Sequence, residues 1–213
     1  ASHQLYTPLS VINWTIEMLR DPKISVEKIK EGIEAVNQSR EDILNIVNDL
    51  LTVSEIGFKY QKTKSEIFSL GDLIRASLEK YKNKIAAKNL KVEFKKEVAD
   101  DKGDFAKFAL EKVFDNLIDN AITYSNDNGK ITLKLTGDDQ SLAFSISDQG
   151  IGIPEGDKSS IFREFFRAKN AIAKKNVGTG LGLFIVKSIV EGHSGKVWFE
   201  SKENEGSKFY FSI

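Results

Sequence analysis

The sequence lacks three features whose absence narrows the possible functions: cysteine, net charge and any long apolar run. A chain without cysteine has no disulfide, no thiolate nucleophile and no zinc–sulfur site, and it favours a reducing compartment, so we expect this region to be cytoplasmic. Its 31 basic and 31 acidic residues balance, which gives no reason to expect nucleic acid or an anionic membrane as a partner. No apolar stretch approaches the roughly 20 residues that a membrane-spanning helix needs.

The residues that are present fit a folded protein. The 213 residues, of which 40% are hydrophobic, suffice for one large or two small domains with a core. The first residues already follow a helical pattern and include no methionine. We therefore expect an N-terminally truncated sequence, in which any membrane attachment would depend on the missing upstream region.

Residues 1–60 show the pattern of two helices joined by a short loop. Asp21-Pro22-Lys23 interrupts the first helical pattern, Ser25 is a candidate cap for the second, and the second ends near Gly57. The apolar positions recur at steps of three and four, as in helices that pack on other helices. They are Leu5, Leu9, Ile12, Ile16 and Leu19, then Ile29, Ile33, Val36, Ile43, Val47, Leu50 and Leu51.

Two helices alone bury too little apolar surface to be stable. The sequence therefore predicts a homodimer formed through the hairpin, as a four-helix bundle. The alternative is that the hairpin packs on the rest of its own chain.

The hydrophobic period changes after the polar stretch Lys59 to Glu66, which predicts a second domain over residues 65–213. We expect strands at 67–70, 90–94, 131–135, 142–146, 196–201 and 207–213, with a hairpin turn at 137–139. We expect helices at 73–87, 105–123, 161–167 and 181–190, and a mobile lid at 168–177. The fold class is then α+β: a helical hairpin followed by a two-layer α/β sandwich.

A histidine lies near the start of the first predicted helix. His3 falls about 200° around that helix from the apolar stripe, so its imidazole should face solvent, and Thr7 follows one turn later on the same face. Pro8 should distort the helix there. A lone exposed histidine is usually an ordinary surface residue, so the position carries little weight without its neighbours.

Two asparagines four residues apart, Asn116 and Asn120, should share one face of the 105–123 helix. Paired amides can hold a hydrated magnesium ion and phosphate oxygens, because hard cations favour oxygen ligands. Taken alone, an ordinary polar helix face explains the pair equally well. The segment continues through Tyr124 and Ser125.

The segment Asp148-Gln149-Gly150-Ile151-Gly152-Ile153-Pro154 follows a predicted strand. It places a carboxylate at the strand end, before two glycines that let the backbone approach a flat ligand. An aspartate in this position is otherwise ordinary turn chemistry.

A glycine-rich turn leads into the last predicted helix as Gly178-Thr179-Gly180-Leu181-Gly182-Leu183. Backbone N–H groups and the positive end of the helix dipole would face a phosphate chain there. The turn lacks the Lys-Ser/Thr ending of a P-loop and the strand context of a dinucleotide fingerprint, which argues against both. Ile161-Phe162-Arg163-Glu164-Phe165-Phe166-Arg167 precedes it.

These segments together resemble the catalytic core of two-component sensor histidine kinases, whose ATP-binding domain is shared with gyrase, Hsp90 and MutL. Ser2-His3-Gln4-Leu5-Tyr6-Thr7-Pro8-Leu9 resembles the phosphoacceptor box, and the other four segments resemble the asparagine, adenine-binding, phenylalanine and glycine boxes. Their order and spacing match the family across essentially the whole chain. The resemblance is therefore far more specific than any single box.

The resemblance implies a protein histidine kinase that uses ATP and Mg²⁺, autophosphorylates His3 and passes the phosphoryl group to an aspartate of a response regulator receiver domain. Asp148 would accept a hydrogen bond from adenine, Asn120 would bind the metal together with Asn116, and Arg167 would reach the γ-phosphate. Catalytic roles fall to His3, Gln4, Thr7 and Arg167. The implied nucleotide-binding residues are Asn116, Asn120, Tyr124, Asp148, Gly150, Gly152, Ile153, Phe165, Gly178, Thr179, Gly180, Leu181, Gly182 and Leu183.

Three positions depart from the family pattern. Gln4 replaces an acidic residue that takes the proton of the histidine; an amide cannot act as that base, so autophosphorylation should be slow or conditional. Thr123 stands where lysine is common and Tyr6 where arginine is usual, so ATP affinity should be modest. Thr7 is retained, and in relatives this position supports dephosphorylation of the regulator.

Two other functions remain open from the sequence. One is a degenerate nucleotide-binding scaffold or phosphatase-biased kinase that autophosphorylates weakly because of Gln4. The other is an ATPase of the chaperone or topoisomerase type, which would not explain the histidine-bearing hairpin.

Overall fold

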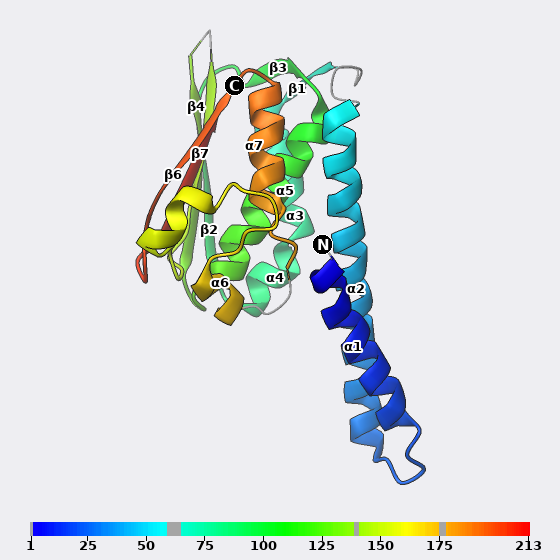
Figure 1. Cartoon of the computed structure of the whole chain (residues 1–213). Helices are drawn as coiled ribbons and strands as arrows, with labels where there is room; N and C mark the ends of the chain where they lie inside the picture. The colour runs from blue at the N-terminus through cyan, green and yellow to red at the C-terminus, as the bar shows by residue number, and fades with distance from the viewer. Residues whose placement is uncertain (1, 59–64, 139–140, 175–177) are drawn as a thin grey trace.

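The computed structural model describes residues 2–58, 65–138, 141–174 and 178–213, and the side chains of residues 2–4 and 55–58 lie outside that description. Two long helices, α1 (Ser2–Leu19) and α2 (Val26–Phe58), form the predicted hairpin. The hairpin stands beside an α/β domain, and the upper half of α2 lies along that domain (Figure 1). Within the described residues, no helix combines the length and apolarity required to cross a membrane.

Small residues allow the two helices of the hairpin to approach closely. Thr15 and Ser39 are buried, and a Cβ on Gly32 would lie 3.0 Å from Cγ2 of Thr15. Part of the apolar stripe predicted from the sequence faces outward instead: Leu9, Ile16, Ile33, Val47 and Leu51 are all more than 40% exposed. This hairpin therefore leaves an apolar face uncovered by its own chain.

The α/β domain is built on a five-stranded sheet with the spatial order β2-β4-β5-β7-β6. Its strands are β2 (Lys91–Glu97), β4 (Lys130–Gly137), β5 (Leu142–Ser147), β6 (Lys196–Lys202) and β7 (Gly206–Ser212). Only the β2–β4 pair is parallel. A small second sheet pairs β1 (Glu66–Ser69) with β3 (Lys102–Phe105).

Helices cover one face of the large sheet, which gives the predicted two-layer sandwich (Figure 1). They are α3 (Leu70–Lys80), α4 (Lys82–Ala87), α5 (Lys107–Tyr124) and α7 (Gly182–Gly192). A 3₁₀ helix, η1 (Glu155–Ser160), and a short helix, α6 (Lys169–Lys174), connect β5 to α7. Phe114 of α5 packs against Phe144 and Phe211 of the sheet, with ring centroids 5.1 and 5.7 Å away.

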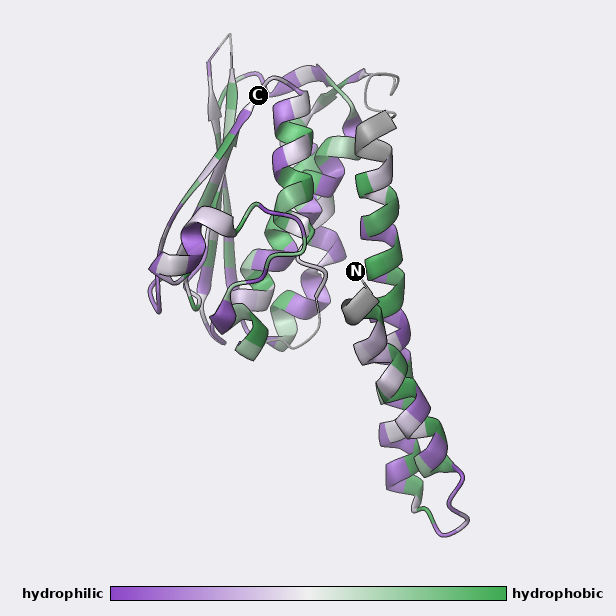
Figure 2. Ribbon diagram, in the orientation of Figure 1, coloured by the Kyte–Doolittle hydropathy of each residue, from purple (hydrophilic) through white to green (hydrophobic). Residues whose placement is uncertain are grey.

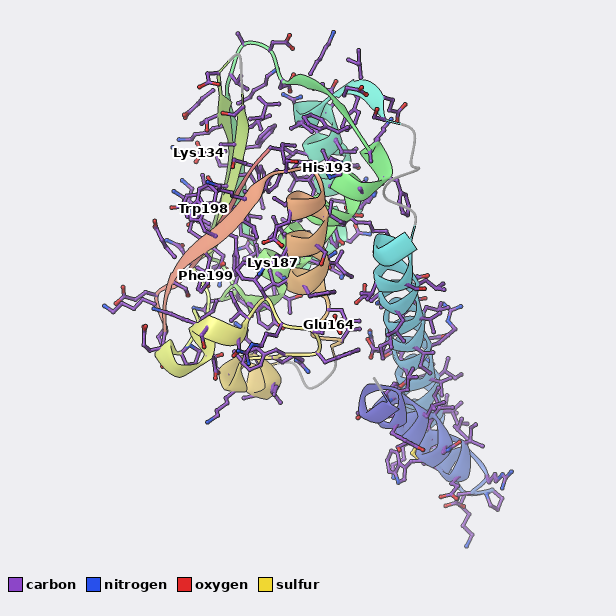
Figure 3. The ribbon with its side chains drawn as sticks, turned by 45° about the horizontal axis from the view of Figure 1, so that its top comes forward. Lys134, Glu164, Lys187, His193, Trp198 and Phe199 are labelled. Atoms are coloured by element: carbon purple, nitrogen blue, oxygen red, sulfur yellow. The ribbon has the colours of Figure 1, made fainter. Side chains whose placement is uncertain are left out.

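Alternation along the strands separates the two faces of the sheet. On β6, Phe199 packs against Phe162 and Phe209, whereas Trp198 stacks on Tyr210 of β7 on the opposite face (Figure 3). The hydropathy colouring shows apolar residues concentrated where helices and sheet meet (Figure 2). The period-two pattern of the sequence therefore identified the strands and their buried faces.

Three predicted elements differ from the structure. The helix expected at 73–87 is divided at Tyr81 into α3 and α4, and the short strand β3 was not predicted. The helix expected at 161–167 is wrong, because Phe165 has a positive φ of 60° that no α-helix accommodates. Helical structure occurs earlier, in η1, directly after Pro154.

Part of the segment predicted as a mobile lid is ordered helix, α6. Residues 175–177 of that segment, and Asp139 of the predicted hairpin turn, lie outside the described residues.

Candidate functional site

A cavity of about 350 Å³ opens between α2, α5, the α6 region and the N-terminal end of α7. It is lined by twelve of the residues predicted to bind or act on the nucleotide: Asn116, Asn120, Tyr124, Asp148, Gly152, Ile153, Arg167, Gly178, Thr179, Gly180, Gly182 and Leu183. The first and last of these residues, Asn116 and Leu183, are 67 positions apart in the sequence. The fold therefore gathers four separate motifs around one cavity.

Asp148 lies just beyond the end of β5 and is only 8% exposed. Burial raises the pKa of Asp148 to about 6, and backbone N–H groups of Ser207 and Gly150 and the charge of Lys174 oppose that rise. Its Oδ1 atom is buried without a hydrogen-bond partner within the described part of the chain. A buried acceptor in this state is ready for a donor on a ligand.

The glycines after Asp148 are required by the protein backbone. Gly152 has a positive φ of 59°, and a Cβ there would lie 2.6 Å from the carbonyl carbon of Lys202. A Cβ on Gly150 would lie 2.8 Å from the carbonyl carbon of Tyr124. These glycines allow β5, α5 and the β6–β7 turn to meet, whereas the sequence suggested that they make room for a ligand.

The glycine-rich turn before α7 meets α5 and Arg167 at the other end of the cavity. A Cβ on Gly182 would lie 2.7 Å from Oδ1 of Asn116, and a Cβ on Gly178 would lie 3.3 Å from Cζ of Arg167. Gly180 needs its positive φ of 68° to pass beneath the backbone of Phe165. A guanidinium and a helix N-terminus thus converge where an anion could bind, and the amide oxygen of Asn116 beside them suits a cation.

The two asparagines of α5 have different surroundings. Nδ2 of Asn116 donates to the carbonyl of Lys112 at 2.9 Å, which turns its Oδ1 toward Gly182. Asn120 lines the cavity one helical turn further along α5. Among the described residues, no cluster of three or more histidine or acidic side chains could hold a metal ion. A metal here would depend on amide and ligand oxygens, which suits Mg²⁺.

Two side chains of helix α6 bond it to backbone carbonyls near the Asp148 end of the cavity. Nδ2 of Asn170 donates to the carbonyls of Ile151 and Gly152 at 3.3 and 3.0 Å. Nζ of Lys174 donates to the carbonyls of Tyr124 and Ser125 at 3.1 and 2.9 Å, at the C-terminal end of α5. A lysine at that end also favours the negative pole of the α5 dipole.

Some residues predicted for the site lie elsewhere. Phe165 is 40% exposed and does not line the cavity, where its neighbour Phe166 lies instead. Leu181 is fully buried in the core, and Gly150 lies behind Asp148. No residue of α1 lines the cavity: Thr7 is half-buried in the hairpin, and the side chains of His3 and Gln4 are outside the described part.

Other lining residues were not found from the sequence. Helix α2 contributes Asp42, Asn45, Asn48 and Asp49, and the α3–α4 junction contributes Tyr81. No local pattern could have identified them, because their role depends on how the hairpin rests against the α/β domain. His193, to which no role was assigned, ends α7 with Nδ1 2.8 Å from the carbonyl of Ile189 (Figure 3).

Two families match the chain. Residues 106–213 match the family described as histidine kinase-, DNA gyrase B-, and HSP90-like ATPase. Residues 1–58 match the His Kinase A (phospho-acceptor) domain.

The relatives are sensor kinases. The sensor histidine kinase WalK of Bacillus subtilis (strain 168) is 30% identical over 217 residues, covering 100% of this chain and 35% of WalK. The sensor protein kinase WalK of Staphylococcus aureus is 31% identical over 218 residues, covering 100% of this chain and 51% of that protein. The chain therefore spans about half the length of these relatives or less.

The solved structures include a complex. Histidine kinase ThkA, in complex with response regulator protein TrrA, matches with a TM-score of 0.79 and 27% identity, covering 100% of this chain and 59% of that chain.

Proposed function

The chain belongs to the histidine kinase-, DNA gyrase B-, and HSP90-like ATPase family, and from this premise we propose that it is the catalytic core of a two-component sensor histidine kinase. In this proposal residues 1–60 form the phosphoacceptor and dimerisation hairpin and residues 65–213 the ATP-binding domain. The core phosphorylates His3 and passes the phosphoryl group to an aspartate of a response regulator.

The observation that carries the proposal is one cavity with two chemically different ends. At one end, buried Asp148 has an oxygen without a partner among the described residues, which suits the amino group of adenine. At the other, Arg167 and the turn before α7 suit a phosphate chain, and the amide oxygen of Asn116 suits the metal ion that accompanies it. A site that reads a base at one end and phosphates at the other is a nucleotide site.

The residues of the chain contribute to phosphoryl transfer by positioning the reacting groups and by stabilising the charge that develops. A neutral nitrogen of His3 attacks the γ-phosphorus in line, the bond to the bridging oxygen breaks, and ADP leaves. Arg167 offsets the negative charge that develops on the transferred group. Asn116 and Asn120 would hold Mg²⁺, which neutralises phosphate charge when bound.

Two proposed partners follow from the hairpin. The outward-facing Leu9, Ile16, Ile33, Val47 and Leu51 supply the apolar surface that a homodimer would bury as a four-helix bundle. The complex of ThkA with TrrA supports a receiver domain as the second partner, because that kinase has the same architecture over the whole length of this chain. Thr7, retained in α1, would then support dephosphorylation of the regulator as a second activity.

The proposal is tested by incubating the chain with Mg²⁺ and γ-labelled ATP beside a His3→Ala variant. We expect acid-labile label on the wild type and none on the variant, because phosphohistidine hydrolyses in acid. Label of equal amount on both proteins would contradict His3 as the acceptor. Bound ATP without any label would favour the alternative, a nucleotide-binding scaffold or phosphatase-biased kinase.

Lys174→Met is expected to weaken ATP affinity about fivefold, because the ammonium group that fastens α6 to the end of α5 is lost. Lys169→Met is the matched control: it removes an exposed lysine from the same helix, whose backbone N–H bonds Asp157. Calorimetric titration with a non-hydrolysable ATP analogue measures both variants. Equal ATP affinities for the Lys174 and Lys169 variants would show that the bonds from Lys174 to the end of α5 do not position α6 for nucleotide binding.

A further inference from the structure

A hydrogen bond joins the hairpin to the glycine-rich turn. Oγ1 of Thr179 donates to Oδ2 of Asp49 at 2.6 Å, across 130 positions of sequence. Neighbouring side chains of α2 reinforce the contact: Ile46 is 2% exposed, and Leu50 and Val53 pack against the core of the α/β domain. The bond therefore lies within a packed interface between α2 and the domain (Figure 1).

The position of this bond matters because Thr179 belongs to the turn proposed to hold phosphates. Its Oγ1 also accepts from the backbone N–H of Leu181 at 3.1 Å, which fixes the hydroxyl at the start of α7. A hydroxyl has one proton to donate, and here it is directed to a carboxylate. Asp49 thus places negative charge beside the N-terminal end of α7, where a phosphate would also bind.

The surroundings of Asp49 partly oppose the ionisation of its carboxyl group. Burial raises the pKa of Asp49, and the hydrogen bond from Thr179 and the charge of Lys112 oppose that rise, while Asp119 adds to it. A buried carboxylate that is held by one short hydrogen bond can give up that bond and become hydrated when a phosphate binds at Thr179 instead.

We propose that Asp49 is an autoinhibitory residue: its carboxylate and a nucleotide phosphate exclude one another at Thr179, so that the resting contact both holds the α/β domain against α2 and weakens nucleotide binding. This inference rests on the proposed function, because it needs phosphate at the glycine-rich turn. Two anions cannot share the single proton of Thr179, and their charges repel at this distance.

The exclusion also bears on transfer to His3. Among the side chains of α1 that the structure describes, from Leu5 onward, none lines the cavity, so a transfer to His3 requires the domain and the hairpin to be suitably placed. Breaking the Asp49–Thr179 bond frees the domain to move relative to the hairpin. Because coupling between two equilibria is reciprocal, whatever moves α2 away from Thr179 should raise nucleotide affinity.

The test compares the affinity for ADP with Mg²⁺, measured by calorimetry, and the initial rate of His3 labelling in four proteins that all comprise residues 1–213. Asp49→Ala should bind about tenfold more tightly, within the range usual for coupled sites, and should label faster than wild type. Asp49→Asn keeps an acceptor of the same shape but loses the charge, so its affinity should fall between the two. Glu41→Ala is the matched control, because it removes an exposed carboxylate eight residues earlier on α2 that pairs with Arg40 and does not line the cavity.

The outcomes separate this inference from the proposed function. If Asp49→Ala and wild type bind ADP equally and label equally, Asp49 is not inhibitory, while the kinase proposal stands. If Glu41→Ala shows the same gain as Asp49→Ala, general charge on α2 and not the Thr179 bond is responsible, and the inference is overturned. If the wild type neither binds ADP nor becomes labelled, the proposed function itself fails.

Discussion

Gln4→Glu is expected to increase the rate of His3 phosphorylation by about 10²- to 10⁴-fold, the usual contribution of a general base. Glutamine can keep the hydrogen-bonding geometry of an acidic residue, but it cannot take a proton from the imidazole. A carboxylate beside His3 would remove that proton as the ring nitrogen attacks phosphorus. Labelling with γ-labelled ATP under single-turnover conditions measures the rate.

ATP affinity provides the control for this substitution. None of the described side chains of α1 lines the cavity, and we expect the two proteins to bind ATP equally. Gln4→Ala should label no faster than wild type. The faster variant should also show a rate that falls when the introduced carboxylate is protonated. Equal rates for glutamine and glutamate would mean that the proton leaves by another route and that the hypothesis about Gln4 is wrong.

The long periodic elements of the fold were predictable from sequence. Helix α5 and strands β4 and β5 each carry one apolar face that repeats with a constant period, so burial determines both the element and its orientation. The short elements were not predictable. Strand β3 has four residues, and it is defined by its pairing with β1, more than thirty positions earlier. Tyr81 divides a continuous helical pattern through its backbone angles alone.

The phenylalanine box illustrates how a family motif can suggest the wrong local structure. Its aromatic residues recur as they would in a short helix, but Phe165 turns the chain with a positive φ and does not line the cavity. Its neighbour Phe166 lines the cavity in its place. The reason is the approach of Gly180, whose own positive φ brings the glycine-rich turn against this backbone. A contact between two segments thus decides the conformation of both.

The residues of the site also divide into those that the sequence predicts and those that only the structure shows. Asp148, Asn116 and the glycines before α7 are found from sequence because each lies at the end or on the face of a regular element. The side chains that hold α6 in place, Asn170 and Lys174, come from a segment without periodicity in the sequence and donate to carbonyl groups of distant residues. Side-chain bonds to distant backbone leave no sequence pattern, so only coordinates reveal them.

Asp148→Asn is expected to reduce ATP affinity about 10²-fold. The carboxylate accepts from the backbone N–H groups of Ser207 and Gly150, and its Oδ1 has no well-formed hydrogen bond within the described part of the chain. An asparagine must turn its NH₂ group either toward those N–H donors or toward the amino group of adenine, so one pair of donors always meets. Leaving a buried donor without an acceptor costs about 1–3 kcal/mol.

Inosine triphosphate separates this hydrogen bond from other effects of the substitution, because it lacks the amino group of adenine. Wild type should bind ATP far more tightly than inosine triphosphate, whereas Asp148→Asn should bind the two alike. Equal losses for both nucleotides would instead mean that the substitution disturbs the fold of the cavity.

The same hydrogen bond predicts a dependence on pH. The pKa of Asp148 in the free protein is raised to about 6 by burial, and the ionised carboxylate is the better acceptor for adenine. Nucleotide binding therefore favours the ionised form, so ATP affinity should rise as the pH passes upward through about 6 and then level off. Inosine triphosphate shares the phosphate ionisations of ATP, so the ratio of the two affinities isolates Asp148. A ratio that stays constant from about one unit below to about two units above the shifted pKa would exclude Asp148 as the residue that reads the base.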